Sequence, residues 1–94
     1  MSSLKTSITY YQDEDEANTI YIEDLYVAEE ERGKGKGRSL LQEAYRYASD
    51  NNYSHISILP MPTEEDGITE SDLRAFYRSF GFSSTEGELM IMSV

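Results

Sequence analysis

The sequence predicts a small α/β domain in which two helices cover a mixed β-sheet, in the order β-β-α-β-α-β. Three observations predict this class. The N-terminal part alternates like paired strands, two later segments carry apolar residues at helical spacing, and a strand-like stretch follows each helix. With 94 residues the chain is too short for two independent cores, so we expect a single domain over residues 1–94.

The N-terminal part predicts an antiparallel hairpin. Strands are expected over residues 7–12 and 19–27, joined by a polar tip over residues 13–18. The tip is rich in carboxylates, but Asn18 stands where the loop of an EF-hand calcium site requires glycine. The tip therefore predicts a solvated turn.

A helix is expected from about residue 38 to residue 50, followed by a strand over residues 53–59. The apolar residues that give this helix its spacing are Leu40, Leu41, Ala44, Tyr45 and Ala48. A polar loop from Pro60 to Gly67 should then lead into the second helix.

Thr69 has the features of an N-cap for the second helix, with Asp72 as the acidic partner of a capping box. Gly81 is well placed to end this helix. The residues that the helix should bury are Leu73, Phe76, Tyr77 and Phe80. A last strand is expected over residues 88–93.

Composition narrows the range of partners. The net charge is −10, from 18 acidic and 8 basic residues, which disfavours direct nucleic-acid binding and favours cationic partners. No cysteine is present, so a disulfide framework and a thiolate metal site are excluded. No apolar run approaches a membrane span, and the first residues do not resemble a signal peptide, so we expect a cytoplasmic protein without a membrane partner.

Half of the basic residues gather in one short segment, where they alternate with glycines. Its members are Arg32, Gly33, Lys34, Gly35, Lys36, Gly37 and Arg38. A glycine-rich turn before a helix directs backbone N–H groups at an anion, and the helix dipole adds positive charge. The alternative is a solvated basic loop. A P-loop does not fit the spacing, and Arg38 stands where a dinucleotide fingerprint needs its third glycine.

Two motifs carry a resemblance to the GNAT superfamily of acetyl-CoA-dependent N-acetyltransferases. One is Arg32-x-x-Gly35-x-Gly37, after the strand end Leu25-Tyr26-Val27, and the other runs from Phe76 to Phe82 (Phe-Tyr-x-x-x-Gly-Phe). The segment Ile20–Leu25 is similar to diamine acetyltransferases, and the compact layout resembles small phage-encoded members that act as anti-CRISPR acetyltransferases. Compared with the family, the chain is expected to lack an N-terminal strand and a helix pair.

The resemblance implies acetyl-CoA as cosubstrate and no metal. It assigns coenzyme binding to Leu25, Tyr26 and Val27 and to the segment Arg32, Gly33, Lys34, Gly35, Lys36, Gly37 and Arg38. It makes Tyr77 the general acid that returns a proton to the leaving sulfur. The alternative for Tyr77 is a core aromatic.

Two neighbouring carboxylates are candidates for acceptor chemistry. Regular alternation would place Tyr21, Glu23, Leu25 and Val27 on one side of the strand. Glu23 is then the candidate base, acting through a water, and Asp24 points the other way unless the strand bulges. Asp24 and Glu70, which stands where the family often has asparagine, are candidate substrate-binding residues. The alternative for Glu23 and Asp24 is a solvated acidic strand.

The resemblance and the charge together predict acetyl transfer to a primary amine, on a lysine of a basic, nucleic-acid-binding protein. A phage inhibitor of host defence, working in the host cytoplasm, is the extension that the resemblance suggests. The alternatives are a polyamine acetyltransferase and a non-catalytic acidic decoy. A homodimer is left open, since a second copy could replace the wall of the acceptor site that the family's N-terminal elements supply.

Overall fold

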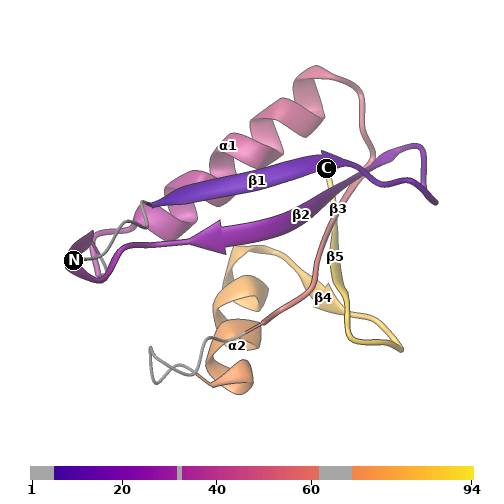
Figure 1. The fold of residues 1–94 in the computed structure, drawn as a ribbon. Coiled ribbons are helices and arrows are strands. Elements are labelled where there is room, and N and C mark those ends of the chain that lie inside the picture. The colour runs from indigo at the N-terminus through magenta and orange to yellow at the C-terminus, as the bar shows by residue number, and fades with distance from the viewer. Residues whose placement is uncertain (1–5, 32, 62–68) are drawn as a thin grey trace.

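The computed structural model describes residues 6–31, 33–61 and 69–94 (Figure 1). Its elements are β1 (Ser7–Gln12), β2 (Thr19–Tyr26), the 3-10 helix η1 (Glu29–Glu31), α1 (Lys36–Asp50), β3 (His55–Ile58), α2 (Glu70–Phe80), β4 (Ser83–Ser84) and β5 (Met90–Ser93). The predicted order is confirmed, with η1 and the short β4 as additions. Within these residues no helix has the length and apolar character needed to cross a bilayer.

The sheet has five strands in the order β1-β2-β3-β5-β4. β1 and β2 form the predicted antiparallel hairpin, β2 and β3 run parallel, and β5 is antiparallel to both β3 and β4. The sheet is therefore mixed, as predicted. The parallel pair follows from the α1 crossover, because parallel neighbours cannot be joined by a tight turn.

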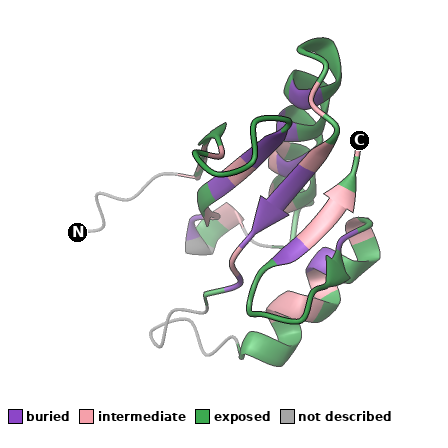
Figure 2. Cartoon of the chain, turned by 90° about the vertical axis from the view of Figure 1, so that its right-hand side faces the viewer, coloured by how far each residue is buried: buried purple, intermediate pink, exposed green. Residues whose placement is uncertain are grey.

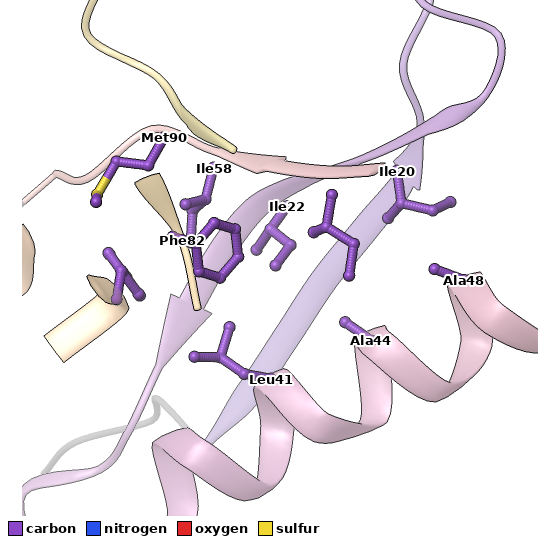
Figure 3. Packing of buried hydrophobic residues seen from close by; sticks show 10 residues of the cluster. Ile20, Ile22, Leu41, Ala44, Ala48, Ile58, Phe82 and Met90 are labelled. Atoms are coloured by element: carbon purple, nitrogen blue, oxygen red, sulfur yellow. The ribbon is translucent and has the colours of Figure 1, made fainter. Parts of the chain in front are cut away.

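Both helices pack on the same face of the sheet. Figure 3 shows Ile20 and Ile22 of β2 beside the small residues Ala44 and Ala48 of α1, all four almost inaccessible to solvent. The complete buried cluster is Ile20, Ile22, Leu41, Ala44, Ala48, Ile56, Ile58, Tyr77, Phe82 and Met90. In Figure 2 the buried colour is concentrated on the central strands and on the helix surfaces that face them. Tyr77 of α2 thus belongs to the same core as α1.

Several boundaries differ from the prediction. α1 begins at Lys36, two residues before the predicted start, because Gly35 adopts a left-handed conformation and serves as N-cap. β3 covers only residues 55–58 and β5 only 90–93, since strand pairing between them ends there. Tyr45 is 38% exposed, so the prediction that it belongs to the apolar stripe is wrong.

The predicted ends of α2 are confirmed. The Thr69 hydroxyl accepts a hydrogen bond from the Asp72 N–H (3.1 Å), and the Asp72 carboxylate accepts one from the Thr69 N–H (3.3 Å). Gly81 ends the helix at φ 136°, a value that side chains other than glycine rarely adopt. The polar loop predicted before this helix lies mostly outside the described residues.

The hairpin tip is an ordinary polar turn. The Asp13 carboxylate accepts hydrogen bonds from the N–H groups of Asp15 (2.8 Å) and Glu16 (3.2 Å). Such side-chain caps on a turn are common for aspartate. The prediction of a solvated turn is confirmed.

Candidate functional site

β2 and β3 separate in the middle of the sheet. Their pairing runs from Thr19 opposite His55 to Ile22 opposite Ile58 and then stops, whereas β2 continues to Tyr26 beside β1. Figure 1 shows β3 turning away as β2 goes on towards η1. From Glu23 onward, the edge of β2 that faces β3 is not hydrogen-bonded to β3. An extended ligand could therefore pair with this backbone.

The glycine turn opens beside the end of β2. Gly33 (φ 79°) and Gly35 (φ 77°) both adopt left-handed conformations, and no atom lies within 4 Å of a Cβ built on either residue. Backbone conformation is therefore what requires glycine at both positions. The space in front of the turn is free of the described side chains.

Among the described residues, the N-cap of α1 at this turn makes no side-chain capping hydrogen bond. Gly35 provides no side-chain hydrogen bond, and no acidic residue stands in the first turn. The first helical hydrogen bond is donated by Ser39 to the Gly35 carbonyl (3.0 Å), so the N–H groups before Ser39 precede the helical ladder. Together with the exposed Lys34 and Lys36, they form a positive site that suits a phosphate.

Thr6 holds the segment between β2 and the turn in place. Its hydroxyl accepts a hydrogen bond from the Ala28 N–H (2.8 Å) and donates one to the Glu31 carboxylate. Glu31 also lies 3.9 Å from the Lys36 ammonium. No local pattern indicates this role for Thr6, because its two partners are more than 20 residues away along the chain.

Gly37 and Arg38 serve the contact between the two helices. A Cβ on Gly37 would lie 3.3 Å from the Phe76 ring and 3.6 Å from Val27, so glycine lets α2 approach the first turn of α1. The Arg38 guanidinium stacks 5.6 Å over Phe80 and donates to the Ser79 hydroxyl (3.2 Å). Arg38 is thus engaged with α2. Arg32, the first residue of the motif, lies outside the described residues.

A β-bulge corrects the predicted alternation of β2. Thr9 of β1 pairs with Asp24, but the next residue, Tyr10, pairs with Ile22, so Glu23 is the extra residue. After the bulge Leu25 packs against the core, on the same side as Ile22. The prediction that Leu25 shares a side with Tyr21 is therefore wrong.

The bulge places Glu23 and Asp24 opposite the same residue of β1, and both carboxylates are exposed. Asp24 shares the face of its partner Thr9, away from the helices. Glu23 raises the pKa of the Tyr11 hydroxyl, which belongs to that same face, so its carboxylate lies near that residue. The two carboxylates are thus neighbours on one face, at the point where β2 and β3 part.

Tyr77 is a buried phenol beside this point. Its ring lies 5.5 Å from Phe76 and 5.8 Å from Phe82, centroid to centroid, and only 5% of the residue is exposed. Burial, and next the negative charge of Asp24, raises the pKa of Tyr77 to about 12. The phenol therefore keeps its proton at any physiological pH and acts as a hydrogen-bond donor.

Glu70 lies at the other end of α2 in an ion pair. Its carboxylate accepts a hydrogen bond from Arg74 Nε (2.9 Å), and Arg74 also donates to the Glu88 carbonyl (2.9 Å). This pairing occupies the side chain that was predicted to contact substrate. Within the described residues no group of three or more His, Asp or Glu side chains could hold a metal ion.

The structure brings together the end of β2, the glycine turn, the first turn of α1, and Tyr77 of α2. It adds features that the sequence did not reveal, namely the bulge at Glu23 and a contact between Tyr11 and Tyr21, whose ring centroids lie 5.7 Å apart. The presence of tyrosines in both strands of the predicted hairpin was the available signal for that contact. Whether the two rings meet depends on the register of the hairpin, which the residue types alone do not determine.

Solved structures with the same fold include acetyltransferases. The anti-CRISPR protein AcrVA5 is 28% identical, with a TM-score of 0.74 over 92% of this chain and 87% of its own. Two further structures share the fold. An IAA acetyltransferase from Bacillus cereus ATCC 14579 is 18% identical, with a TM-score of 0.69 over 93% of this chain and 68% of its own. The N-acetyltransferase YhbS from Escherichia coli, solved with CoA, is 22% identical, with a TM-score of 0.60 over 81% of this chain and 42% of its own. This chain spans less than half of YhbS.

A search among curated proteins finds no significant match. The model of the acetyltransferase (GNAT) family, in contrast, matches residues 7–82, which is most of the chain and includes both sequence motifs. The strand order, the parting of β2 from β3 and the glycine turn before α1 are the structural counterpart of that match. The chain belongs to the GNAT family of N-acetyltransferases.

Proposed function

We propose that this chain binds acetyl-CoA at the glycine turn and transfers the acetyl group to a lysine of a basic protein. The observation that carries the proposal is the convergence of three features at one end of β2. These are the uncapped N-terminus of α1, the β2 edge that has left β3, and the buried phenol of Tyr77. Each feature suits a different part of a thioester substrate.

The glycine turn supports the pyrophosphate part of the proposal. The positive φ values of Gly33 and Gly35 leave the approach to the helix N-terminus free of Cβ atoms. The exposed side chains of Lys34 and Lys36 add positive charge, which attracts a phosphate, to a chain that is acidic as a whole. A solved GNAT neighbour contains CoA, which agrees with this assignment.

The open edge of β2 supports the placement of the thioester. Backbone groups of Leu25, Tyr26 and Val27 would lie along the pantetheine arm, and an N–H there would donate to the carbonyl oxygen as negative charge develops on it. Acetyl-CoA supplies an activated acyl carbon and a stable leaving thiolate. The protein supplies orientation and proton transfer.

The proton balance of the transfer fits the groups present. A lysine amine has a reference pKa of about 10.4, so a carboxylate at the bulge must take up its proton, directly or through a water, before or during attack. A C–N bond forms, the C–S bond breaks, and Tyr77 donates a hydrogen bond to the departing sulfur. The pKa of the Tyr77 phenol is about 12, whereas a free thiol has a pKa of about 8.5, so the thiolate does not take the phenol proton. Tyr77 therefore stabilises the thiolate by a hydrogen bond, and a proton from solvent completes the reaction.

The structure gives the two carboxylates different surroundings. Asp24 is the charge that acts on Tyr77, whereas Glu23 acts on Tyr11 at the surface. We therefore favour Asp24 as the base, with Glu23 as an acceptor-binding residue, which exchanges the roles predicted from alternation. Glu23 as base remains the second candidate.

The acceptor class rests on charge. A chain with net charge −10 attracts a basic protein, and acetylation would remove a positive charge from it. The likeness to an anti-CRISPR protein over most of both chains supports a role against a bacterial defence nuclease in a phage-infected host cytoplasm. A polyamine acceptor and a non-catalytic decoy are the alternatives to test.

Calorimetric titration with acetyl-CoA tests the first step, with desulfo-CoA and ATP as controls. We expect micromolar binding of acetyl-CoA and of desulfo-CoA and much weaker binding of ATP. Mass spectrometry of basic peptides and of spermidine after incubation with acetyl-CoA then tests transfer. A folded protein that does not bind acetyl-CoA would contradict the proposal and favour the decoy.

In the same assay Tyr77→Phe should bind acetyl-CoA normally and turn over about 10- to 1,000-fold more slowly, because only the hydroxyl is lost. Tyr45→Phe, which removes a hydroxyl from an exposed tyrosine of α1, is the control and should turn over like the wild type. Unchanged turnover of Tyr77→Phe would remove Tyr77 from the mechanism.

A further inference from the structure

The face of the sheet turned away from α1 and α2 carries a pair of tyrosines. Tyr10 and Ile22 pack against the core on the helix side, so their neighbours Tyr11 and Tyr21 lie on the opposite side. Within the described residues both helices cover the core side only. We call the surface formed by Tyr11, Tyr21, Glu23 and Asp24 the open face.

Tyr11 and Tyr21 form an aromatic platform on the open face. They stand directly opposite each other in the hairpin register, with ring centroids 5.7 Å apart and planes inclined at 57°. Tyr11 is 42% exposed. Tyr21 is half-buried, so the exposed Tyr11 ring with the accessible part of Tyr21 presents an electron-rich aromatic surface to a cation.

Carboxylates surround the platform. The Glu23 carboxylate, more than burial or the charge of Glu14, raises the pKa of Tyr11, so the negative charge at the bulge lies close to this ring. Asp24 follows Glu23 on the same face, and the acidic hairpin tip continues the negative surface at the other end. No lysine or arginine interrupts the sequence from Thr6 to Glu31, so nothing in the hairpin neutralises these charges.

A buried hydroxyl beside Tyr21 has no partner. Ser57 of β3 stands opposite Tyr21, is 5% exposed, and its Oγ makes no hydrogen bond with the described residues. A buried hydroxyl without a partner destabilises the folded protein. A ligand group that enters beside the Tyr21 ring would supply the missing partner, so this hydroxyl is a second indication of a binding surface.

We propose that the open face binds the acceptor, as an extended basic polypeptide segment that lies over Tyr11 and Tyr21 with cationic side chains between the rings and Glu23. This inference rests on the proposed function. The segment would deliver its lysine to Asp24, at the end of the platform where β2 parts from β3.

The dimensions favour a polypeptide over a free polyamine. The six residues of β1 extend for about 20 Å at roughly 3.3 Å per residue, and the carboxylates occupy both ends of the platform. A small amine gains most of its affinity by enclosure in a pocket. The exposed rings provide a long, flat surface, which suits a strand-like segment.

Kinetics with a peptide whose single lysine is flanked by arginines test the proposal. Tyr11→Leu should raise the KM for this peptide about 2- to 30-fold, the range expected for loss of a cation–π contact, with kcat and the KM for acetyl-CoA within about twofold. Tyr11→Phe keeps the ring and should retain most of the affinity. Tyr45→Leu, at a comparably exposed tyrosine on α1, is the matched control and should leave the KM unchanged.

Direct binding of the same peptide, measured by titration without acetyl-CoA, separates this inference from the proposed function. If the wild type transfers nothing but Tyr11→Leu still weakens peptide binding, the acceptor surface stands and the catalytic proposal fails. If transfer occurs and Tyr11→Leu behaves like Tyr45→Leu, the open face is not the acceptor surface. A preference for spermidine over the peptide in kcat/KM would overturn the polypeptide acceptor.

Discussion

Tyr77 shows how one side chain can serve both the core and the proposed chemistry. Its ring packs between Phe76 and Phe82, and its hydroxyl responds to Asp24 near the end of β2. The burial that positions the ring also raises the pKa of the phenol to about 12. A neutral donor is thereby held where a leaving thiolate would form.

The raised pKa of Tyr77 predicts a loss of stability at high pH. Below pH 10 the folded and the unfolded chain both keep this proton, so the ionisation of Tyr77 does not reduce the free energy of unfolding. Above pH 10 the unfolded chain loses it first, and stability falls until the pH passes the folded pKa of about 12. From pH 9 to pH 11 the free energy of unfolding of the wild type should fall by about 1 kcal/mol more than that of Tyr77→Phe.

Urea unfolding at the two pH values measures this difference. Tyr45→Phe, at an exposed tyrosine, is the control and should follow the wild type. An identical pH dependence of Tyr77→Phe and wild type would show that the phenol is not shielded as the structure indicates.

The two carboxylates of the bulge should respond differently to amide substitution. We expect Asp24→Asn to lower kcat about 100-fold with little change in the acceptor KM, because a proton acceptor is lost. Glu23→Gln should raise the acceptor KM and leave kcat within a few fold. The reverse pattern would restore Glu23 as the base, and steady-state kinetics with a basic peptide distinguish the two outcomes.

At the scale of the element, the first turn of α1 contributes both to the packing of the fold and to the proposed binding site. Gly35 begins the helix in a left-handed conformation, and Gly37 makes room for Phe76 of α2. The same turn leaves its N–H groups to a ligand. Glycine is therefore needed for backbone conformation at one position and for helix packing at the other.

Gly35→Glu should abolish acetyl-CoA binding, because a carboxylate would stand in front of the positive helix end. Gly35→Asn is the control, since asparagine tolerates the left-handed conformation better than other side chains and adds no charge. We expect it to retain binding within about tenfold, as measured by calorimetry. Normal binding by Gly35→Glu would mean that the phosphate site lies elsewhere.

The capping box of α2 gives an element-scale test of stability. Thr69→Ala removes the hydroxyl that accepts from the Asp72 N–H and should cost about 1 kcal/mol. Ser71→Ala, in the exposed first turn of the same helix, should not destabilise the protein. Thermal unfolding of both variants checks the comparison, and equal melting temperatures would show that the cap contributes nothing.

At the scale of the whole molecule, charge is divided between two surfaces. The hairpin carries carboxylates on the open face, and half of the basic residues stand at the turn before α1 and in its first turn. In the function proposed above, acceptor and coenzyme would therefore approach from different sides of the parting between β2 and β3. This division suits a reaction in which both substrates are bound at once.

The acidic hairpin predicts a salt-dependent affinity for basic acceptors. Raising ionic strength from about 0.05 M to 0.5 M shortens the screening length to a few Å, and should weaken binding of an arginine-flanked peptide by about tenfold. Binding of a peptide with a lone lysine should change less. Equal salt dependence of the two peptides would show that the long-range field does not recruit the acceptor.

The sequence by itself determined the local features of this protein. The capping box at Thr69, the ends of the hairpin strands and the glycine turn depend on neighbours within a few residues, so their residue types predict them directly. The family motifs followed from the same local pattern, and the GNAT match confirmed the fold that they imply. The apolar spacing also identified Tyr77 as a core residue of α2.

Only the tertiary structure decided how distant segments meet. The extra residue at Glu23 reverses the side on which Leu25 lies, and a bulge is set by strand pairing, which no local pattern encodes. The parting of β2 from β3, the electrostatic influence of Asp24 on Tyr77 and the Tyr11–Tyr21 pair depend on the same long-range register. The residues of the candidate site were thus readable from the sequence, whereas the roles proposed for them required their arrangement in space.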